Sequence, residues 1–281
     1  GQCLVEEGKP RESLAWFKKL RRTSSALGDQ WGVGQSYINA GVAYCALSEE
    51  RNARKSLEKA VHHARETGDE WLLGRSLYDL ATVVVDEDVP AAMQLAEESM
   101  VYKAKVDDEF GVLRSEMLLG ATRGWMGEHS EAITAFRSVE RRAHAAGRPE
   151  IEAQAANNAG IACSQAKHFR RAAQHHQRAR RIAEKADVVE ALILAAESEA
   201  NAMFSSGEYA KAEALCKEAR RLHKRQGNQR DAAVALYNRG MAIRLWKDSA
   251  RARRVLGQAL REAHAAKYDW LAIQCHLAKA Q

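Results

Sequence analysis

Apolar and small residues return every three or four positions along almost the whole chain. That spacing places them on one face of an α-helix, whereas a half-buried strand would alternate apolar and polar residues. Short turn-forming pairs interrupt the pattern at Gly28-Asp29, Gly68-Asp69, Asp107-Asp108, Gly147-Arg148, Ala186-Asp187, Gly227-Asn228 and Tyr268-Asp269. Successive pairs are 39 to 41 residues apart, so the sequence predicts a repeat of about forty residues.

Each repeat contains a second break near its middle, as at Gly127-Glu128 and Gly207-Glu208. Two helices per repeat are therefore expected. Pro10 and Pro90 are placed to open second helices and Pro149 a first helix, because the missing N–H of proline has no partner in the first turn anyway. The sequence predicts an all-α solenoid of about seven antiparallel helix pairs.

Small residues occupy fixed places in both helices of the repeat. First helices carry Gly41, Ala81, Gly120, Gly160, Ala200 and Gly240. Second helices carry Ala53, Ala92, Ala132, Ala172, Ala212 and Ala252, followed four residues later by Leu57, Ala96, Phe136, His176, Cys216 and Leu256. Small side chains let two helices approach closely, and the larger residue fills the adjoining groove. His176 is the one polar member of its row, so we expect looser packing there.

This arrangement resembles the tetratricopeptide repeat (TPR). The resemblance is clearest in Tyr37-xx-Ala40-Gly41-xx-Tyr44, continued by Ala53-xxx-Leu57-xx-Ala60, and it returns in Gly207-Glu208-Tyr209-xx-Ala212. The period exceeds the ordinary TPR length of about 34 residues. It is similar to the long-helix variety of polarity scaffolds, bacterial peptide-sensing regulators and the sensor arms of large signalling NTPases. The resemblance implies a right-handed superhelix and a role in binding proteins or peptides.

One TPR-like solenoid is expected over residues 1–281. Its repeat units are 29–68, 69–107, 108–147, 148–187, 188–227 and 228–268, with partial units at 1–28 and 269–281. Terminal repeats of a solenoid normally need a polar cap. Neither end shows one, so we expect the chain to be a fragment of a longer protein.

Charge is divided unevenly along the chain. Residues 1–140 carry 17 Lys and Arg against 23 Asp and Glu, a net charge of −6. Residues 141–281 carry 26 against 14, a net charge of +12. Such a division concerns partners and assembly rather than fold, and it predicts salt-sensitive self-association if the chain is an assembly protein.

No window approaches the roughly 18 uninterrupted apolar residues of a membrane span, so no membrane partner is expected. The cysteines lie far apart and form no CxxC pair, at Cys3, Cys45, Cys163, Cys216 and Cys275. This spacing argues against a disulfide framework or a zinc site. A reducing, cytoplasmic location fits best.

Motifs for catalysis or cofactor binding are missing from the sequence. There is no GxxxxGK[ST] loop, HExxH or GxSxG, and Gly32-Val33-Gly34 follows no strand. The histidine pairs His62-His63 and His175-His176 point about 100° apart on a helix, so neither pair grips one metal from one face. We expect these imidazoles, and that of His223, to lie on helix surfaces or fill grooves. The sequence predicts no enzyme, no metal and no cofactor.

The TPR resemblance implies that first helices line a concave groove. The groove residues flank the small Gly/Ala position, and they are Gln35, Asn39, Arg75, Tyr78, Asp79, Arg114, Gln154, Asn157, Asn158, Asn201, Tyr237, Asn238 and Arg244. Asn39, Asn158 and Asn238 each stand two residues before the glycine. In TPR proteins an asparagine at this place often contacts the backbone of a ligand peptide. The alternative is that these asparagines bond neighbouring helices or water.

The arginines of the groove set are shaped for bidentate pairing with acidic ligand side chains. A further basic cluster, Arg220-Arg221-xx-Lys224-Arg225, lies on a second helix, which the resemblance places on the convex side. Three interpretations of it stay open: a solvated face, a surface for an acidic protein or for the acidic half of another copy, and a nucleic-acid site. Nucleic acid is the least favoured because few aromatic residues lie among the charges.

The leading hypothesis is a non-catalytic module that captures a peptide or protein segment in its groove, as the sensor or scaffold arm of a larger regulator. The alternative is a structural docking or assembly protein that uses end-to-end or convex-face electrostatic contacts.

Overall fold

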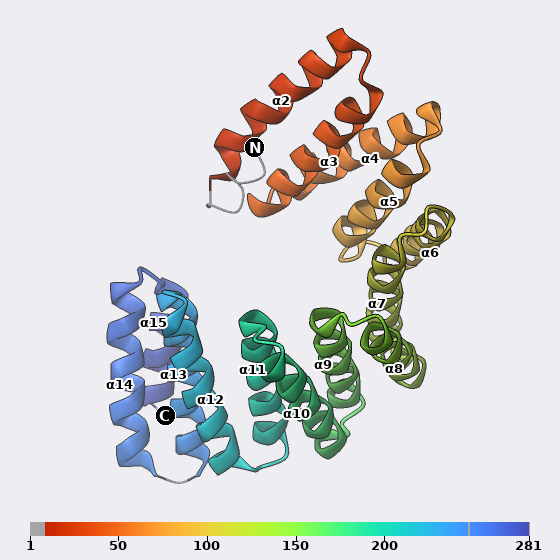
Figure 1. The fold of residues 1–281 in the computed structure, drawn as a ribbon. Helices are drawn as coiled ribbons and strands as arrows, with labels where there is room; N and C mark the ends of the chain where they lie inside the picture. The colour runs from red at the N-terminus through yellow and green to blue at the C-terminus, as the bar shows by residue number, and fades with distance from the viewer. Residues whose placement is uncertain (1–8, 247, 281) are drawn as a thin grey trace. The chain divides into compact units, whose positions relative to one another are not determined.

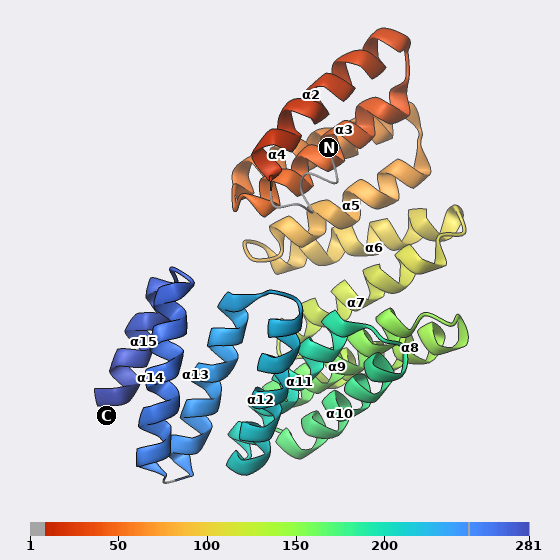
Figure 2. The same ribbon diagram turned by 60° about the vertical axis from the view of Figure 1, so that its left-hand side comes forward.

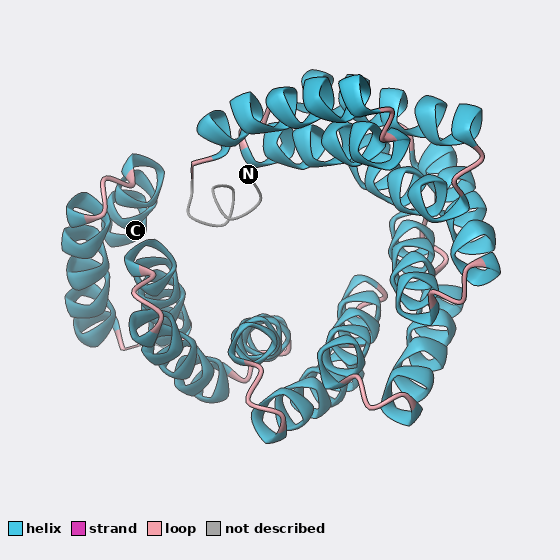
Figure 3. Cartoon of the chain, turned by 45° about the horizontal axis from the view of Figure 1, so that its top comes forward, coloured by secondary structure: helices cyan, strands magenta, loops and turns pink. Residues whose placement is uncertain are grey.

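Regular structure in the described part of the chain, residues 9–246 and 248–280 of a computed structural model, is entirely α-helical (Figure 3). Helices α2 to α15 follow one another as hairpins (Figure 1). Their bounds are α2 (Pro10–Leu27), α3 (Gln30–Ala46), α4 (Glu50–Thr67), α5 (Glu70–Val84), α6 (Val89–Lys105), α7 (Glu109–Trp125), α8 (His129–Ala145), α9 (Pro149–Gln165), α10 (Phe169–Lys185), α11 (Val189–Ser205), α12 (Tyr209–Arg225), α13 (Gln229–Leu245), α14 (Ser249–Ala265) and α15 (Asp269–Ala280). Cys3 and the first residues of the expected partial unit 1–28 lie outside the described residues.

Helix boundaries fall at the predicted turn pairs, and the local chemistry explains why. Gly28 ends α2 with a left-handed φ of 71°, which glycine adopts without steric cost. The side chain of Asp29 then accepts a hydrogen bond from the backbone N–H of Gly32 and caps α3. Pro10 and Pro149 are the first residues of α2 and α9, as predicted. The all-α hairpin pattern of the sequence is confirmed.

The chain divides into two compact units, residues 1–126 and 127–281. Unit 1 contains α2 to α7, and unit 2 contains α8 to α15. Within each unit, every helix packs against the next one in the chain (Figure 2). The odd-numbered helices are the first helices of the repeats, and the even-numbered ones are the second helices. First helices also touch across repeats, α3 with α5 and α9 with α11.

The predicted rows of small residues lie in the contacts between first and second helices. The second-helix row of Ala53, Ala92, Ala132, Ala172, Ala212 and Ala252 is at most 1% exposed. A Cβ added to Gly41 would lie 2.6 Å from Cγ of Leu57. Two helix backbones therefore approach each other so closely that only glycine fits against the leucine. The pairing of a small residue with a larger one is confirmed at this contact.

His176 occupies the larger-residue position in unit 2 and is only 1% exposed. Its Nδ1 lies 2.7 Å from Oδ1 of Asn157, and a Cβ on Gly160 would lie 2.5 Å from its ring. Burial lowers the pKa of His176 to about 4. The expected looser packing is wrong, because the imidazole fills the groove as a leucine would and bonds a buried carboxamide.

Ion pairs connect second helices across repeats, where these helices do not pack closely. Arg65 of α4 pairs with Glu98 of α6 at 2.8 Å, and Arg180 of α10 pairs with Glu218 of α12 at 3.2 Å. Glu213 of α12 is more deeply placed, with its side chain 10% exposed between two arginines. The second-helix face is thus bridged by charges rather than by apolar contacts.

Candidate binding surfaces

Asn39 lies on α3 in unit 1, where its side chain is engaged within its own helix. Gln35 Nε2 donates a hydrogen bond to Asn39 Oδ1 at 3.0 Å. Gln35 and Asn39 are 8% and 7% exposed. The structure therefore places these two predicted groove residues in a buried pair, with little surface left for a ligand.

Four other predicted residues of unit 1 come together on α5 and α7. Arg75 Nε pairs with Asp79 Oδ2 at 3.2 Å, one helical turn away. The guanidinium of Arg114 lies 4.7 Å from the centre of the Tyr78 ring, and its Nη2 donates to the Tyr78 hydroxyl at 3.5 Å. Arg75 is thus already matched by a carboxylate. Arg114 is exposed and available to an acidic group.

Lys103 of α6 belongs to this cluster and was missed by the sequence analysis. It is 5% exposed, and its Nζ lies 3.2 Å from Ser115 Oγ and 4.1 Å from the centre of the Tyr78 ring. Burial, assisted by the charge of Arg114, lowers the pKa of Lys103 to about 8. The sequence contained a signal for this residue, because a long lysine stands where the other second helices have alanine or, once, histidine. The equivalent residues are Ala64, Ala143, Ala183, His223 and Ala263.

Unit 1 also exposes aromatic rings that the sequence analysis did not single out. Trp31 and Trp71 are 53% and 39% exposed, and their ring centres are 6.4 Å apart. Phe110 stands at the same place in the next first helix and is 44% exposed. All three directly follow the first residue of their helix, and that common position is the signal that identifies them.

The predicted residues on α9 in unit 2 separate into two groups. Asn157 is 2% exposed and bonds His176, so it belongs to the contact of α9 with α10. We remove it from the groove set. Gln154 is exposed and Asn158 is half-buried, which keeps both side chains at the surface of the first helix.

Three predicted residues of unit 2 meet at one hollow of about 210 Å³. Asn201 of α11 and both Tyr237 and Asn238 of α13 line it. The apolar part of the lining includes Phe204 and Met241. A lining that combines two asparagines and a tyrosine with apolar side chains can hold a ligand by shape and fix its orientation by hydrogen bonds.

Cys216 and Arg244 lie near these helices, and the structure gives each of them a structural role. Cys216 also lines the hollow, where burial raises the pKa of its thiol to about 12. The thiol therefore stays protonated and is not an activated nucleophile. Arg244 Nη1 donates to the carbonyl oxygen of Ala278 in α15 at 3.2 Å, which directs this predicted groove residue toward the neighbouring first helix.

The predicted basic cluster lies on α12. Arg220 Nη2 pairs with Glu262 of α14 at 2.6 Å, and Lys224 Nζ lies 3.7 Å from the same carboxylate. Arg221 and Arg225 are exposed. Part of the cluster is therefore a connection between second helices, and part of it faces outward.

None of the described residues forms a group of three His, Cys, Asp or Glu side chains placed to hold a metal ion. No helix among them combines the length and the apolar character that a bilayer span requires.

The chain matches no protein-family model, and no curated protein matches it. Solved structures do match. A STAND protein (signal transduction ATPase with numerous domains) with a tetratricopeptide repeat sensor, from Pyrococcus horikoshii, is 16% identical with a TM-score of 0.70 over 94% of this chain. The match covers 40% of that protein's chain.

Two further solved structures give similar values. A Rap protein complexed with Competence and Sporulation Factor is 14% identical with a TM-score of 0.65, covering 89% of this chain and 74% of the other. The apo form of the quorum sensor NprR from B. thuringiensis is 14% identical with a TM-score of 0.62, covering 96% and 86%. At such identities the similarity defines the fold. The chain has the all-α solenoid fold of TPR-like repeat proteins, and the resemblance stated from its sequence is confirmed.

Proposed function

We propose that the chain is a non-catalytic module that binds a protein or peptide segment on the first helices of unit 2. The observation that carries this proposal is the hollow lined by Asn201, Tyr237 and Asn238. An asparagine side chain both donates and accepts, so it can pair with the N–H and C=O of an extended peptide backbone. The apolar wall of Phe204 and Met241 suits one apolar ligand side chain.

Two of the similar structures support a role in binding a ligand. One is named as a Rap protein in complex with Competence and Sporulation Factor, and another as a quorum sensor. The Pyrococcus protein is named for a TPR sensor within a larger ATPase. A sensor or scaffold arm of a larger regulator is the corresponding proposal for this chain.

The test is peptide selection followed by matched affinity measurements. A displayed random-peptide library is selected against the wild-type chain, and fluorescence anisotropy then gives Kd for each selected peptide. Truncating both Asn201 and Asn238 to alanine is expected to weaken binding by about 100-fold, since each lost hydrogen bond is worth about 1 to 1.5 kcal/mol. Asn52→Ala is the control, because Asn52 is exposed on α4 and bonds only Glu49 in the described structure.

Two results would contradict the proposal. If no peptide is selected, the chain does not capture peptides. If Kd is unchanged in the double variant, the peptide binds somewhere other than the hollow. Far-ultraviolet circular dichroism establishes that the variants keep their helices.

A docking or assembly protein is the second candidate, and the charge division between residues 1–140 and 141–281 favours it. Opposite charges attract copies of the chain most strongly at low ionic strength. The expected result is an average mass that rises with concentration in light scattering at low salt and falls back as salt is added. A monomer mass independent of concentration at low salt would rule this candidate out.

A further inference from the structure

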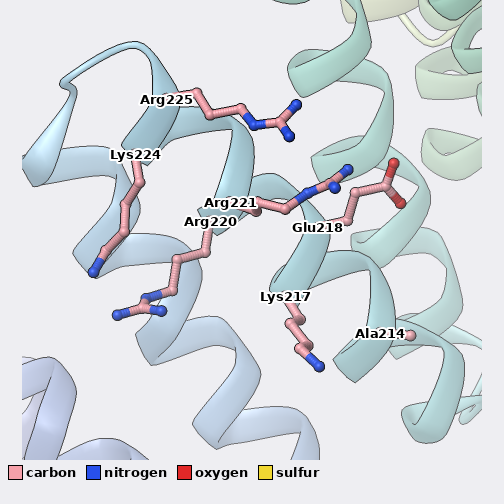
Figure 4. A pocket seen from close by; sticks show the side chains of 7 residues that line it. All are labelled: Ala214, Lys217, Glu218, Arg220, Arg221, Lys224 and Arg225. Carbon is pink, nitrogen blue, oxygen red and sulfur yellow. The ribbon is translucent and has the colours of Figure 1, made fainter.

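The outward part of the basic cluster continues along α12 as a regular row. Lys217, Arg221 and Arg225 follow one another at four-residue intervals, so they lie along one side of the helix about 6 Å apart. All three line a hollow of about 780 Å³ on unit 2 (Figure 4). Arg221 and Arg225 extend to one side of α12, and Arg220 and Lys224 extend to the other (Figure 4). We call Lys217, Arg221 and Arg225 the α12 row.

Other charges of the same helix are compensated. Arg220 and Lys224 share Glu262, and Lys211 pairs with Glu208 at 2.5 Å. Among the described residues that line the hollow, Glu218 is the one acid, and it is bonded by Arg180. Within the described residues, no carboxylate oxygen lies within 4 Å of a charged nitrogen of the α12 row.

An uncompensated row disfavours the helix that carries it. Like charges one turn apart cost a few tenths of a kcal/mol per pair, whereas opposite charges at that spacing stabilise. The second helix α4 shows the stabilising arrangement, with Arg54 and Glu58 paired at 2.9 Å. Helix stability therefore does not explain the α12 row.

We propose that the α12 row binds an acidic segment of a partner protein. An extended chain advances about 3.3 Å per residue, so carboxylates on alternate residues are about 6.6 Å apart and match the spacing of the row. Arginine pairs with carboxylates through two parallel hydrogen bonds. The aliphatic stems of the three side chains and Ala214 supply apolar surface beneath the charges.

The lining of the hollow favours a protein over a nucleic acid. No aromatic side chain is among the described residues that line it. Single-stranded nucleic acids gain much of their affinity by stacking bases on aromatic rings. The α12 row shares no residue with the hollow proposed above as the peptide site, which takes only Ala212 and Cys216 from α12, so the variants that test the two proposals are different.

The probe is a fluorescent nine-residue peptide with glutamates at three alternate positions. Fluorescence anisotropy at low salt measures its Kd for the wild type and for R221E/R225E. The double reversal is expected to weaken binding at least about tenfold, because two of the three cations become repulsive. R253E/R254E is the matched control: both arginines are exposed on α14, outside the hollow, and the change in net charge is the same. This control is expected to bind as the wild type does.

The other outcomes overturn the proposal. Equal loss in both double variants would show attraction to net charge alone. A glutamine version of the peptide that binds equally well would exclude carboxylate recognition. If a single-stranded oligonucleotide of the same charge binds more tightly through Arg221 and Arg225, the occupant is a nucleic acid. If R221E/R225E abolishes self-association without any peptide, the occupant is a second copy of the chain.

Discussion

Replacing Glu213 by alanine is expected to lower the free energy of unfolding by about 3 kcal/mol. Its carboxylate joins three consecutive helices, because Oε1 pairs with Arg239 of α13 at 2.9 Å and also with Arg251 of α14. Glu213 itself is 8% exposed. Removing one partner of a buried ion pair typically costs about 3 to 5 kcal/mol, because the opposite charge is left without compensation. The partial exposure of both arginines places the expected value at the lower end.

Urea unfolding followed by circular dichroism measures this change. Glu58→Ala is the control, since Glu58 pairs with Arg54 on the surface of α4 with both side chains about half exposed, and exposed pairs contribute about 0.2 to 1 kcal/mol. A Glu213→Met/Arg239→Met double variant is expected to recover part of the loss, because it removes one of the two arginine charges that Glu213→Ala leaves unpaired, while Arg251 stays uncompensated. If Glu213→Ala lowers the free energy of unfolding no more than Glu58→Ala does, the ion pairs of Glu213 stabilise the fold no more than an exposed surface pair.

Methionine in place of Lys103 is expected to remove a dependence of stability on pH between about 8 and 10.5. Burial lowers the pKa of Lys103 from 10.5 to about 8 in the folded chain. Below pH 8 both states hold the proton, and the folded state bears the full cost of the buried charge. Between pH 8 and 10.5 the unfolded state binds more protons, so stability rises with pH and gains about 3 kcal/mol across this range.

The measurement is the free energy of unfolding of wild type and Lys103→Met at several pH values from 7 to 10.5. The difference between the two proteins is expected to change by about 3 kcal/mol in favour of the wild type as pH rises. Lys105→Met is the control, since Lys105 lies two residues along α6 and is paired with Glu70 at 3.0 Å on the surface. A constant difference between wild type and Lys103→Met would show that this amine titrates normally.

The helices and their order follow from local sequence. Turn residues such as Gly28 and Asp29 end one helix and cap the next through their own backbone preferences and side-chain bonds. Gly41 and Leu57 predict a close contact between the two helices of their repeat, because a small residue in the first helix and a larger one in the second recur at the same places in successive repeats. Both kinds of inference hold because the interactions lie within one hairpin, a short distance along the chain.

The candidate sites were only partly predictable. Asn39 and Asn158 stand at equivalent places, and each follows a glutamine by four residues, Gln35 or Gln154. In α3 that glutamine is buried and bonds the asparagine, whereas in α9 it is exposed. The same local pattern thus gives one engaged carboxamide and one at the surface. Contacts with neighbouring helices decide between the two, and no single repeat encodes them.

Sequence alone determined that this chain is an all-α repeat protein, where its helices begin and end, and that the basic cluster belongs to a second helix. Tertiary structure decided which polar groups are free to bind. The slot that buries Lys103 forms only where Gly74 of α5 and Gly111 of α7 leave room for its stem. The hollow around Asn201 and Asn238 forms between different repeats. Burial and pairing depend on residues of neighbouring helices, such as Lys103 with Gly111 or Arg220 with Glu262, and only packing brings those residues together.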